Sequence, residues 1–217
     1  MMLIGSLRGH GLALPPLLGS GPAPSGGYYT KADIREVVAH ARTLGIEIVP
    51  EIDMPAHCYA LLQALPELRD PAEGGTYESV QGFANNCLNP ARDAVYRFVE
   101  AVIDEMLDLF PGRMFHIGAD EVPLSAWSGS PEALALLERL AGPEVARRHA
   151  GLCGSTATHG TADAIEGSGT AILQAYFVER VQRFIAGRGA ICGGWEEAAH
   201  GDAVDRTKSY LVAWRDI

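Results

Sequence analysis

Two adjacent acidic residues, Asp120 and Glu121, follow a short apolar segment that is typical of a buried strand. Neighbouring side chains in a regular strand point to opposite faces, but at its last residues both carboxylates can turn toward a ligand above the strand end. Crowding them at a partly desolvated edge is expected to raise the pKa of one of the two. A protonated acid beside an ionised one is what cleavage of a glycosidic bond requires. Alternatively, Asp120 caps a turn and Glu121 is solvated, and the spacing alone does not decide.

A second polar group surrounds the end of another apolar segment, 46–53. Glu51 and Asp53 are two residues apart and therefore face the same side of a strand, where buried acids need partners or water. His57 lies in the loop that follows, where it can hydrogen-bond a neighbouring acid and hold its orientation. The alternatives are that His57 is an ordinary surface or core histidine, and that Glu51, more than Asp53, belongs to a structural hydrogen-bond pair.

Two tryptophans, Trp195 and Trp214, each end a further apolar segment. Aromatic faces at such positions can stack on the apolar faces of sugar rings and exclude water from the bond being broken. Alternatively, both side chains simply cover the core. Trp127 lies in the loop sequence SAWSGSP, and we expect it to serve packing.

The composition excludes several classes of protein. The chain has 217 residues with 17 Lys and Arg against 27 Asp and Glu, a formal net charge of −10, and it contains no basic run. We therefore expect no nucleic-acid binding. Hydrophobic residues make up 47% and charged residues 20%, which indicates a globular chain with a core. No apolar stretch reaches the roughly 18 to 20 residues of a membrane span, so we expect none.

Motifs for cofactors and metals are also missing from the sequence. The four cysteines (Cys58, Cys87, Cys153 and Cys192) lie far apart without ligand spacing, so we expect free thiols rather than a zinc site or disulfides. No GxGxxG or GxxxxGK[ST] loop follows a strand. The first 27 residues do not have the order of a signal peptide, so the sequence assigns no compartment.

Apolar periodicity predicts helices and strands in alternation. Helices are expected at 30–44, at 90–110 behind an Asn89-Pro90 cap, at 131–140 and at 170–187, with a short one at 58–65. Strands are expected at 46–53, 114–118, 190–195 and 210–214, while 1–27 is expected to be an irregular loop and 142–169 a loose stretch. This order predicts an α/β fold with parallel strands. Polar residues beyond the strand ends favour a (β/α)8 barrel over an open doubly wound sheet.

Four blocks of the sequence closely resemble the catalytic domain of the family 20 glycoside hydrolases, the β-N-acetylhexosaminidases. The blocks are YYTKADIREVVAHARTLGIEIVPEIDMPAH, LFPGRMFHIGADEVP, ICGGWEEA and YLVAWRD, and they match in order and spacing over nearly the whole chain. The resemblance implies a TIM barrel that removes terminal N-acetylglucosamine or N-acetylgalactosamine from glycans or chitooligosaccharides without a metal or cofactor. It also implies a substrate-assisted retaining mechanism, in which the sugar's own 2-acetamido oxygen attacks the anomeric carbon.

The resemblance further implies a role for each candidate residue. Asp120 would hold the acetamido nitrogen, and Glu121 would protonate the leaving oxygen and later activate water. His57 would support Glu121 through hydrogen bonds, and Trp195 and Trp214 would enclose the acetamido methyl and the sugar ring.

We count Asp53 with the substrate-binding residues, on its position at a strand end. The family's first two and last strands have no counterpart in these 217 residues, so we expect one partial domain, 1–217, forming an incomplete barrel. Its open edges would allow self-association. PAH replaces the family's PGH, and GADE replaces the common GGDE. The alternative to an enzyme is a catalytically incomplete half-barrel that binds carbohydrate or is purely structural.

Overall fold

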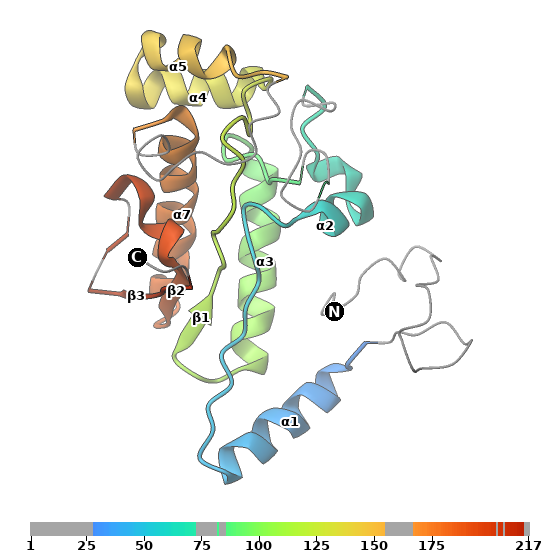
Figure 1. The fold of residues 1–217 in the computed structure, drawn as a ribbon. Helices are drawn as coiled ribbons and strands as arrows, with labels where there is room; N and C mark the ends of the chain where they lie inside the picture. The colour runs from blue at the N-terminus through green and yellow to red at the C-terminus, as the bar shows by residue number, and fades with distance from the viewer. Residues whose placement is uncertain are drawn as a thin grey trace.

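The computed structural model describes residues 28–72, 82, 86–154, 167–202, 204–205 and 207–214, and it forms an α/β arrangement (Figure 1). Its elements in chain order are α1 (Lys31–Thr43), α2 (Tyr59–Ala64), η2 (Pro66–Leu68), α3 (Asp93–Leu109), β1 (Met114–His116), α4 (Pro131–Ala141), α5 (Pro143–Ala150), α7 (Gly169–Gly187), β2 (Ile191–Trp195), η3 (Glu196–Asp202) and β3 (Ser209–Val212). The expected loop at 1–27 lies outside the described residues. Among the described residues, no helix is both long and apolar enough to cross a membrane.

The sheet is parallel, with strand order β1-β2-β3. Met114 pairs with Ile191 at the start of β1, and Trp195 pairs with Val212 at the end of β2. Helix α7 is part of the crossover from β1 to β2, and it packs against β2. The predicted parallel arrangement is confirmed for these three strands, whose carboxyl ends therefore point the same way. A long α-helix lies in the connection from β1 to β2, whereas the described part of the connection from β2 to β3 contains the 3-10 helix η3.

The predicted strand at 46–53 is wrong as a strand, although its chain runs beside β1. Its ladder consists of one parallel bridge, Glu51 to His116, with backbone hydrogen bonds from the Ile52 and Met54 amides to the His116 and Ile117 carbonyls. Pro50 has no N–H and only accepts, from the His116 amide at 2.9 Å. Upstream, the Glu47 side chain binds the Arg113 amide at 3.1 Å in place of backbone pairing.

Side-chain caps explain where three helices begin. Thr30 and Asp33 form a reciprocal capping box at α1, because each side chain accepts from the other residue's backbone N–H. Ser130 caps α4 and Ser168 caps α7 by a one-way hydrogen bond, in which each side-chain oxygen accepts from a backbone N–H of the first turn. These helices and the short α2 confirm the predictions for their segments.

Two helix predictions need correction. Helix α3 begins at Asp93 rather than directly after Asn89-Pro90. Asn89 instead closes a turn, with its side chain accepting from the Ala91 amide and its carbonyl from the Arg92 amide. The stretch 142–169 is not uniformly loose, because it contains α5, which Gly142 and Pro143 start directly after α4. Residues 155–166 of that stretch lie outside the described residues.

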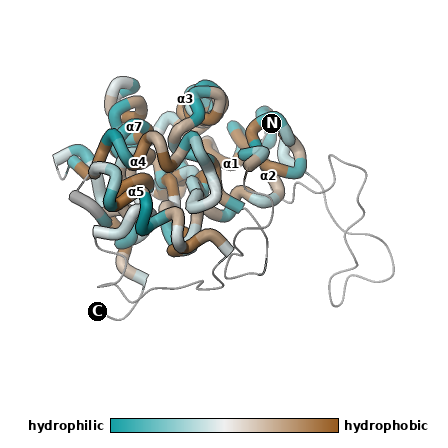
Figure 2. The backbone as a smooth tube through the Cα atoms, turned by 90° about the horizontal axis from the view of Figure 1, so that it is seen from above, coloured by the Kyte–Doolittle hydropathy of each residue, from teal (hydrophilic) through white to brown (hydrophobic). Residues whose placement is uncertain are grey.

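Two apolar clusters form the core. One lies between the strands and helices α1, α3 and α7, and includes Phe115, Ile103 and Phe177. The other joins α4, α5 and α7 around Trp127, whose indole is fully buried and donates to the Leu88 carbonyl at 3.1 Å. The packing role predicted for Trp127 is confirmed. Figure 2 shows hydrophilic and hydrophobic residues alternating around the turns of the helices, as expected for helices packed on one side.

Candidate active site

The tandem acids lie in a sharp backbone turn at the end of β1. Gly118, Ala119 and Glu121 have φ angles of 68°, 68° and 51°, in the left-handed region that non-glycine residues rarely adopt. The Gly118 carbonyl accepts from the Trp195 amide at 2.8 Å, which fixes this turn to the end of β2. The turn ends the alternation of a strand, so Asp120 and Glu121 can point into one site.

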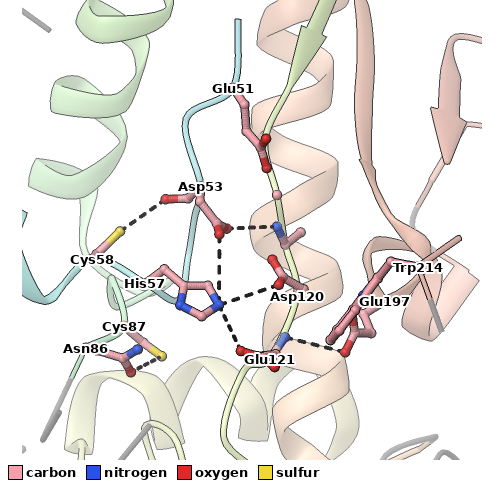
Figure 3. A network of polar contacts seen from close by, with 12 residues as sticks. Glu51, Asp53, His57, Cys58, Asn86, Cys87, Asp120, Glu121, Glu197 and Trp214 are labelled. Atoms are coloured by element: carbon pink, nitrogen blue, oxygen red, sulfur yellow. Dashed lines mark hydrogen bonds and ion pairs between the residues drawn. The ribbon is translucent and has the colours of Figure 1, made fainter. Parts of the chain in front are cut away.

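His57 lies at the centre of the acidic group (Figure 3). Its Nε2 atom lies 3.4 Å from Oε2 of Glu121, 3.5 Å from Oδ2 of Asp120 and 3.9 Å from Oδ2 of Asp53. These three carboxyl groups come from two segments that are far apart in the sequence. The structure thus brings together four of the predicted site residues, with the carboxyl groups of three of them around Nε2 of His57.

Asp53 packs closely against the backbone of this turn and accepts a hydrogen bond from it. Its Oδ1 accepts from the Ala119 amide at 3.3 Å. A Cβ atom at Gly118 would lie 1.9 Å from the same Oδ1 and 3.0 Å from the Asp53 Cα atom. Glycine is therefore required at 118 both for its positive φ and for the space that Asp53 occupies.

The pKa values follow from burial and from the shared histidine. Burial, aided by the negative charge of Asp120, raises the pKa of Asp53 to about 8. Burial also disfavours ionised Asp120, but its hydrogen bond with His57 and the charge of His57 outweigh burial and lower its pKa. The hydrogen bond to Asp120 likewise raises the pKa of His57, against burial. The raised pKa expected for one acid of the tandem pair does not fall on Asp120; among the carboxyl groups around His57, the pKa of Asp53 is raised instead.

The two candidate tryptophans differ in their surroundings. The edge of the Trp195 ring meets the His116 ring, with centroids 4.9 Å apart. Trp214 lies two residues beyond β3, and its indole Nε1 donates to Oε2 of Glu197 at 3.2 Å. The other oxygen of Glu197 accepts from the Glu121 amide at 3.5 Å, so Trp214 is linked to the acid pair through one carboxylate.

Sequence reasoning gave no role to several residues around the site. Glu197 lies in the block ICGGWEEA without a spacing that assigns it a role, and the helix residue Gln174 carries no sequence signal. The Gln174 amide is buried and donates to the carbonyls of Ala119 and Glu197, at 2.9 and 3.3 Å. Glu51 contacts Nδ1 of His116 at 3.1 Å, which agrees with its interpretation as a structural partner.

Three residues of this group carry atoms of the kind that bind divalent cations, but the raised pKa values of Asp53 and His57 favour their protonated forms, which do not bind a metal. Asp53, His57 and Asp120 offer ligand atoms that all lie within 4.8 Å of one another. The expectation of a reaction without a metal comes from the family resemblance and not from the spacing of these residues. The four cysteines are free, and Cys58 donates from its buried thiol to the Asp53 carbonyl at 3.5 Å.

Replacing Gly118 by Ala should destabilise the fold by about 2 to 4 kcal/mol, since it adds both left-handed strain and a clash with Asp53. The matched control is Gly45→Ala, which has a φ of +73° but nothing within 4 Å of its added Cβ. Chemical denaturation of both variants measures the difference. Equal losses for the two would contradict the close approach.

Replacing Asp53 by Asn should change how stability depends on pH. Between about pH 4 and 8 the folded state keeps a proton on Asp53 that the unfolded state has lost, so wild-type stability falls as pH rises and levels off above 8. The stability of Asp53→Asn relative to wild type should therefore grow over this range. Denaturant titrations at several pH values measure it.

The control for this titration is Asp104→Asn on α3. The ion pair with Arg188 lowers the pKa of Asp104, so wild type should gain stability over this variant as pH rises through the acidic range. If the difference in stability between Asp53→Asn and wild type did not change between about pH 4 and 8, Asp53 would titrate as an ordinary carboxyl.

Comparison with known proteins identifies relatives of the whole described chain. The model of the glycosyl hydrolase family 20 catalytic domain matches residues 4–217. A β-hexosaminidase of Vibrio furnissii is 37% identical over 212 residues, which cover 97% of this chain and 30% of the relative. The chain thus spans about a third of the length of that curated relative.

Solved structures give the same relationship. The exo-β-N-acetylglucosaminidase of Vibrio harveyi in complex with N-acetylglucosamine is 36% identical with a TM-score of 0.71, over 89% of this chain and 26% of that one. A mutant β-hexosaminidase of Streptomyces plicatus in complex with the product GlcNAc is 27% identical with a TM-score of 0.54, over 89% of this chain and 30% of that one.

Proposed function

The chain belongs to glycosyl hydrolase family 20, and from this membership we propose that the protein hydrolyses terminal non-reducing N-acetylhexosamine residues from β-N-acetylhexosaminides. The observation that carries the proposal is that Asp120 and Glu121 both contact the same imidazole nitrogen, Nε2 of His57. The curated relative is named a β-hexosaminidase, and two solved relatives hold N-acetylglucosamine. The substrates we propose are glycans or chitooligosaccharides that end in N-acetylglucosamine or N-acetylgalactosamine.

The protonation states fit a substrate-assisted reaction. Asp120 keeps its charge because His57 lowers its pKa, and its buried Oδ1 takes no hydrogen bond from the described residues. An ionised acceptor of this kind can bind the N–H of the 2-acetamido group and stabilise the positive charge that develops when the acetamido oxygen attacks the anomeric carbon. Because the substrate supplies the nucleophile, this reaction requires neither a metal nor a cofactor.

Glu121 is proposed as the general acid and base. It donates its proton to the leaving oxygen as the glycosidic bond breaks, and it then takes a proton from the water that opens the oxazolinium ring. His57 contacts Glu121 at 3.4 Å and holds it in the same group as Asp120. Trp214, at 49% exposure, presents an accessible aromatic face for the sugar, and Trp195 completes the wall at the end of β2.

We extend the proposal to the architecture. Three parallel strands with their acids at the carboxyl ends fit one part of a (β/α)8 barrel, with residues 1–217 as part of its catalytic domain. Leu211 and Val212 of β3 are exposed, at 45% and 38%, which fits cover by further strands or by a second copy. The alternative of a carbohydrate-binding or structural half-barrel predicts binding of the sugar without turnover.

Glu121→Gln should lower kcat/KM for an aryl N-acetyl-β-glucosaminide by about 10²- to 10⁴-fold, because the amide cannot protonate the leaving oxygen. Asp120→Asn should also lower it by at least about 10²-fold, because the amide carries no charge. Steady-state kinetics of the full-length protein measure both. Near wild-type turnover in either variant would refute the assignment, and Glu36→Gln on the exposed face of α1 is the control.

An N-trifluoroacetyl substrate should be hydrolysed at least about tenfold more slowly than its N-acetyl counterpart, because fluorine withdraws electrons from the attacking carbonyl oxygen. The comparison uses one aryl leaving group for both sugars. A protein carboxylate acting as nucleophile would be almost indifferent to this change. Equal rates of hydrolysis for the two substrates would therefore show that the acetamido oxygen is not the nucleophile.

A further inference from the structure

We propose that Glu197 is a positioning residue. Its single carboxylate holds both the general acid, Glu121, and the indole of Trp214 in place. The inference rests on the proposed function, because it assigns Glu121 the role of acid and Trp214 that of sugar contact. Figure 3 shows Glu197 next to Trp214 and joined by a dashed line to the Glu121 amide; Glu197 lies on η3, the segment that follows β2.

The contacts of Glu197 are divided between two elements. Its Oε1 accepts from the backbone amide of Glu121, and its Oε2 accepts from the indole Nε1 of Trp214. The residue is only 5% exposed, so these N–H donors replace water around the carboxylate. A carboxylate buried at this depth requires such partners, and the two atoms it holds belong to segments 93 residues apart in the sequence.

The backbone at both ends of this link is also fixed. Glu121 has a φ of 51°, a conformation that a non-glycine residue keeps only where its surroundings hold it. The amide of Gln174 donates to the carbonyls of both Ala119 and Glu197, which ties the acid turn and the Glu197 segment to α7. Glu197 is therefore held to α7, and its carboxylate binds a turn whose backbone conformation is otherwise unfavourable.

The chemistry of the two contacts requires a carboxylate in particular. Both partners are N–H donors, so both oxygens of residue 197 must accept. A glutamine of the same shape offers one acceptor and one NH₂ group, and the NH₂ would face an N–H. Glu197→Gln therefore preserves size and burial while it loses one of the two contacts.

Loss of either contact has a defined consequence. A shift of about 1 Å in an acid can cost about 10²-fold in rate, because proton transfer depends on its distance from the leaving oxygen. The loss grows with the need for protonation: a dinitrophenolate leaves readily without a proton, whereas a sugar alkoxide does not. A residue that positions the acid therefore affects the two kinds of substrate unequally.

The test compares kcat/KM of wild type and Glu197→Gln for two substrates, a 2,4-dinitrophenyl N-acetyl-β-glucosaminide and chitobiose. The expected result is a loss on chitobiose at least about tenfold greater than the loss on the dinitrophenyl substrate, in the same direction as for Glu121→Gln. Glu179→Gln, which changes an exposed carboxylate paired with Arg183 on α7, is the control and should leave both values unchanged.

Equal losses on the two substrates, or none, would overturn the proposal, because a merely structural role lowers the amount of folded enzyme for both alike. Should Glu197→Gln fail to fold, Glu197→Asp keeps two acceptors on a shorter side chain and is held to the same criterion. A wild type that hydrolyses neither substrate would instead refute the proposed function, so the two failures are distinguishable.

Discussion

The site depends on the sharing of one imidazole by three carboxyl groups. Nε2 of His57 lies between 3.4 and 3.9 Å from an oxygen of Asp53, Asp120 and Glu121, and carboxyl groups crowded in a partly buried place disfavour one another's ionisation. The conflict is resolved by unequal protonation. Asp120 has its pKa lowered by His57, while burial and the charge of Asp120 keep a proton on Asp53. Asp120 therefore keeps a negative charge, and it lies next to Glu121, which we propose as the general acid and base.

The fold supplies this arrangement through backbone conformations that few residues tolerate. The turn at the end of β1 passes through three left-handed residues, and His57 itself has a φ of 55°. Gly118 lets Asp53 approach the turn closely, while Gln174 from α7 binds the carbonyls of the turn and of the segment after β2. Strain of this kind is retained where surrounding contacts over-determine it, as they do here.

The sequence predicts much of this, because the relevant signals are local. Caps and apolar periodicity locate α1, α4 and α7, and the polar residues beyond the strands identify Asp120, Glu121 and His57 as neighbours. The failures have two causes, pairing with a segment distant in sequence and a local turn that competes with the helix start. Pairing with the short β1 reduces 46–53 to one bridge, and an Asn89 turn delays the start of α3. The ionisation of Asp53 and the double contact of Glu197 depend on burial and on partners that no spacing reveals.

The most direct test of the central claim is the pKa of His57, measured by NMR titration of ¹⁵N-histidine-labelled protein with the His57 signal assigned by its loss in His57→Asn. The account predicts that the His57 imidazolium persists above the ordinary value of 6.5 and that Asp120→Asn brings its pKa back down, because their hydrogen bond is the largest cause of the shift. A wild-type His57 that titrates at or below 6.5, unaffected by Asp120→Asn, would contradict the shared-imidazole account.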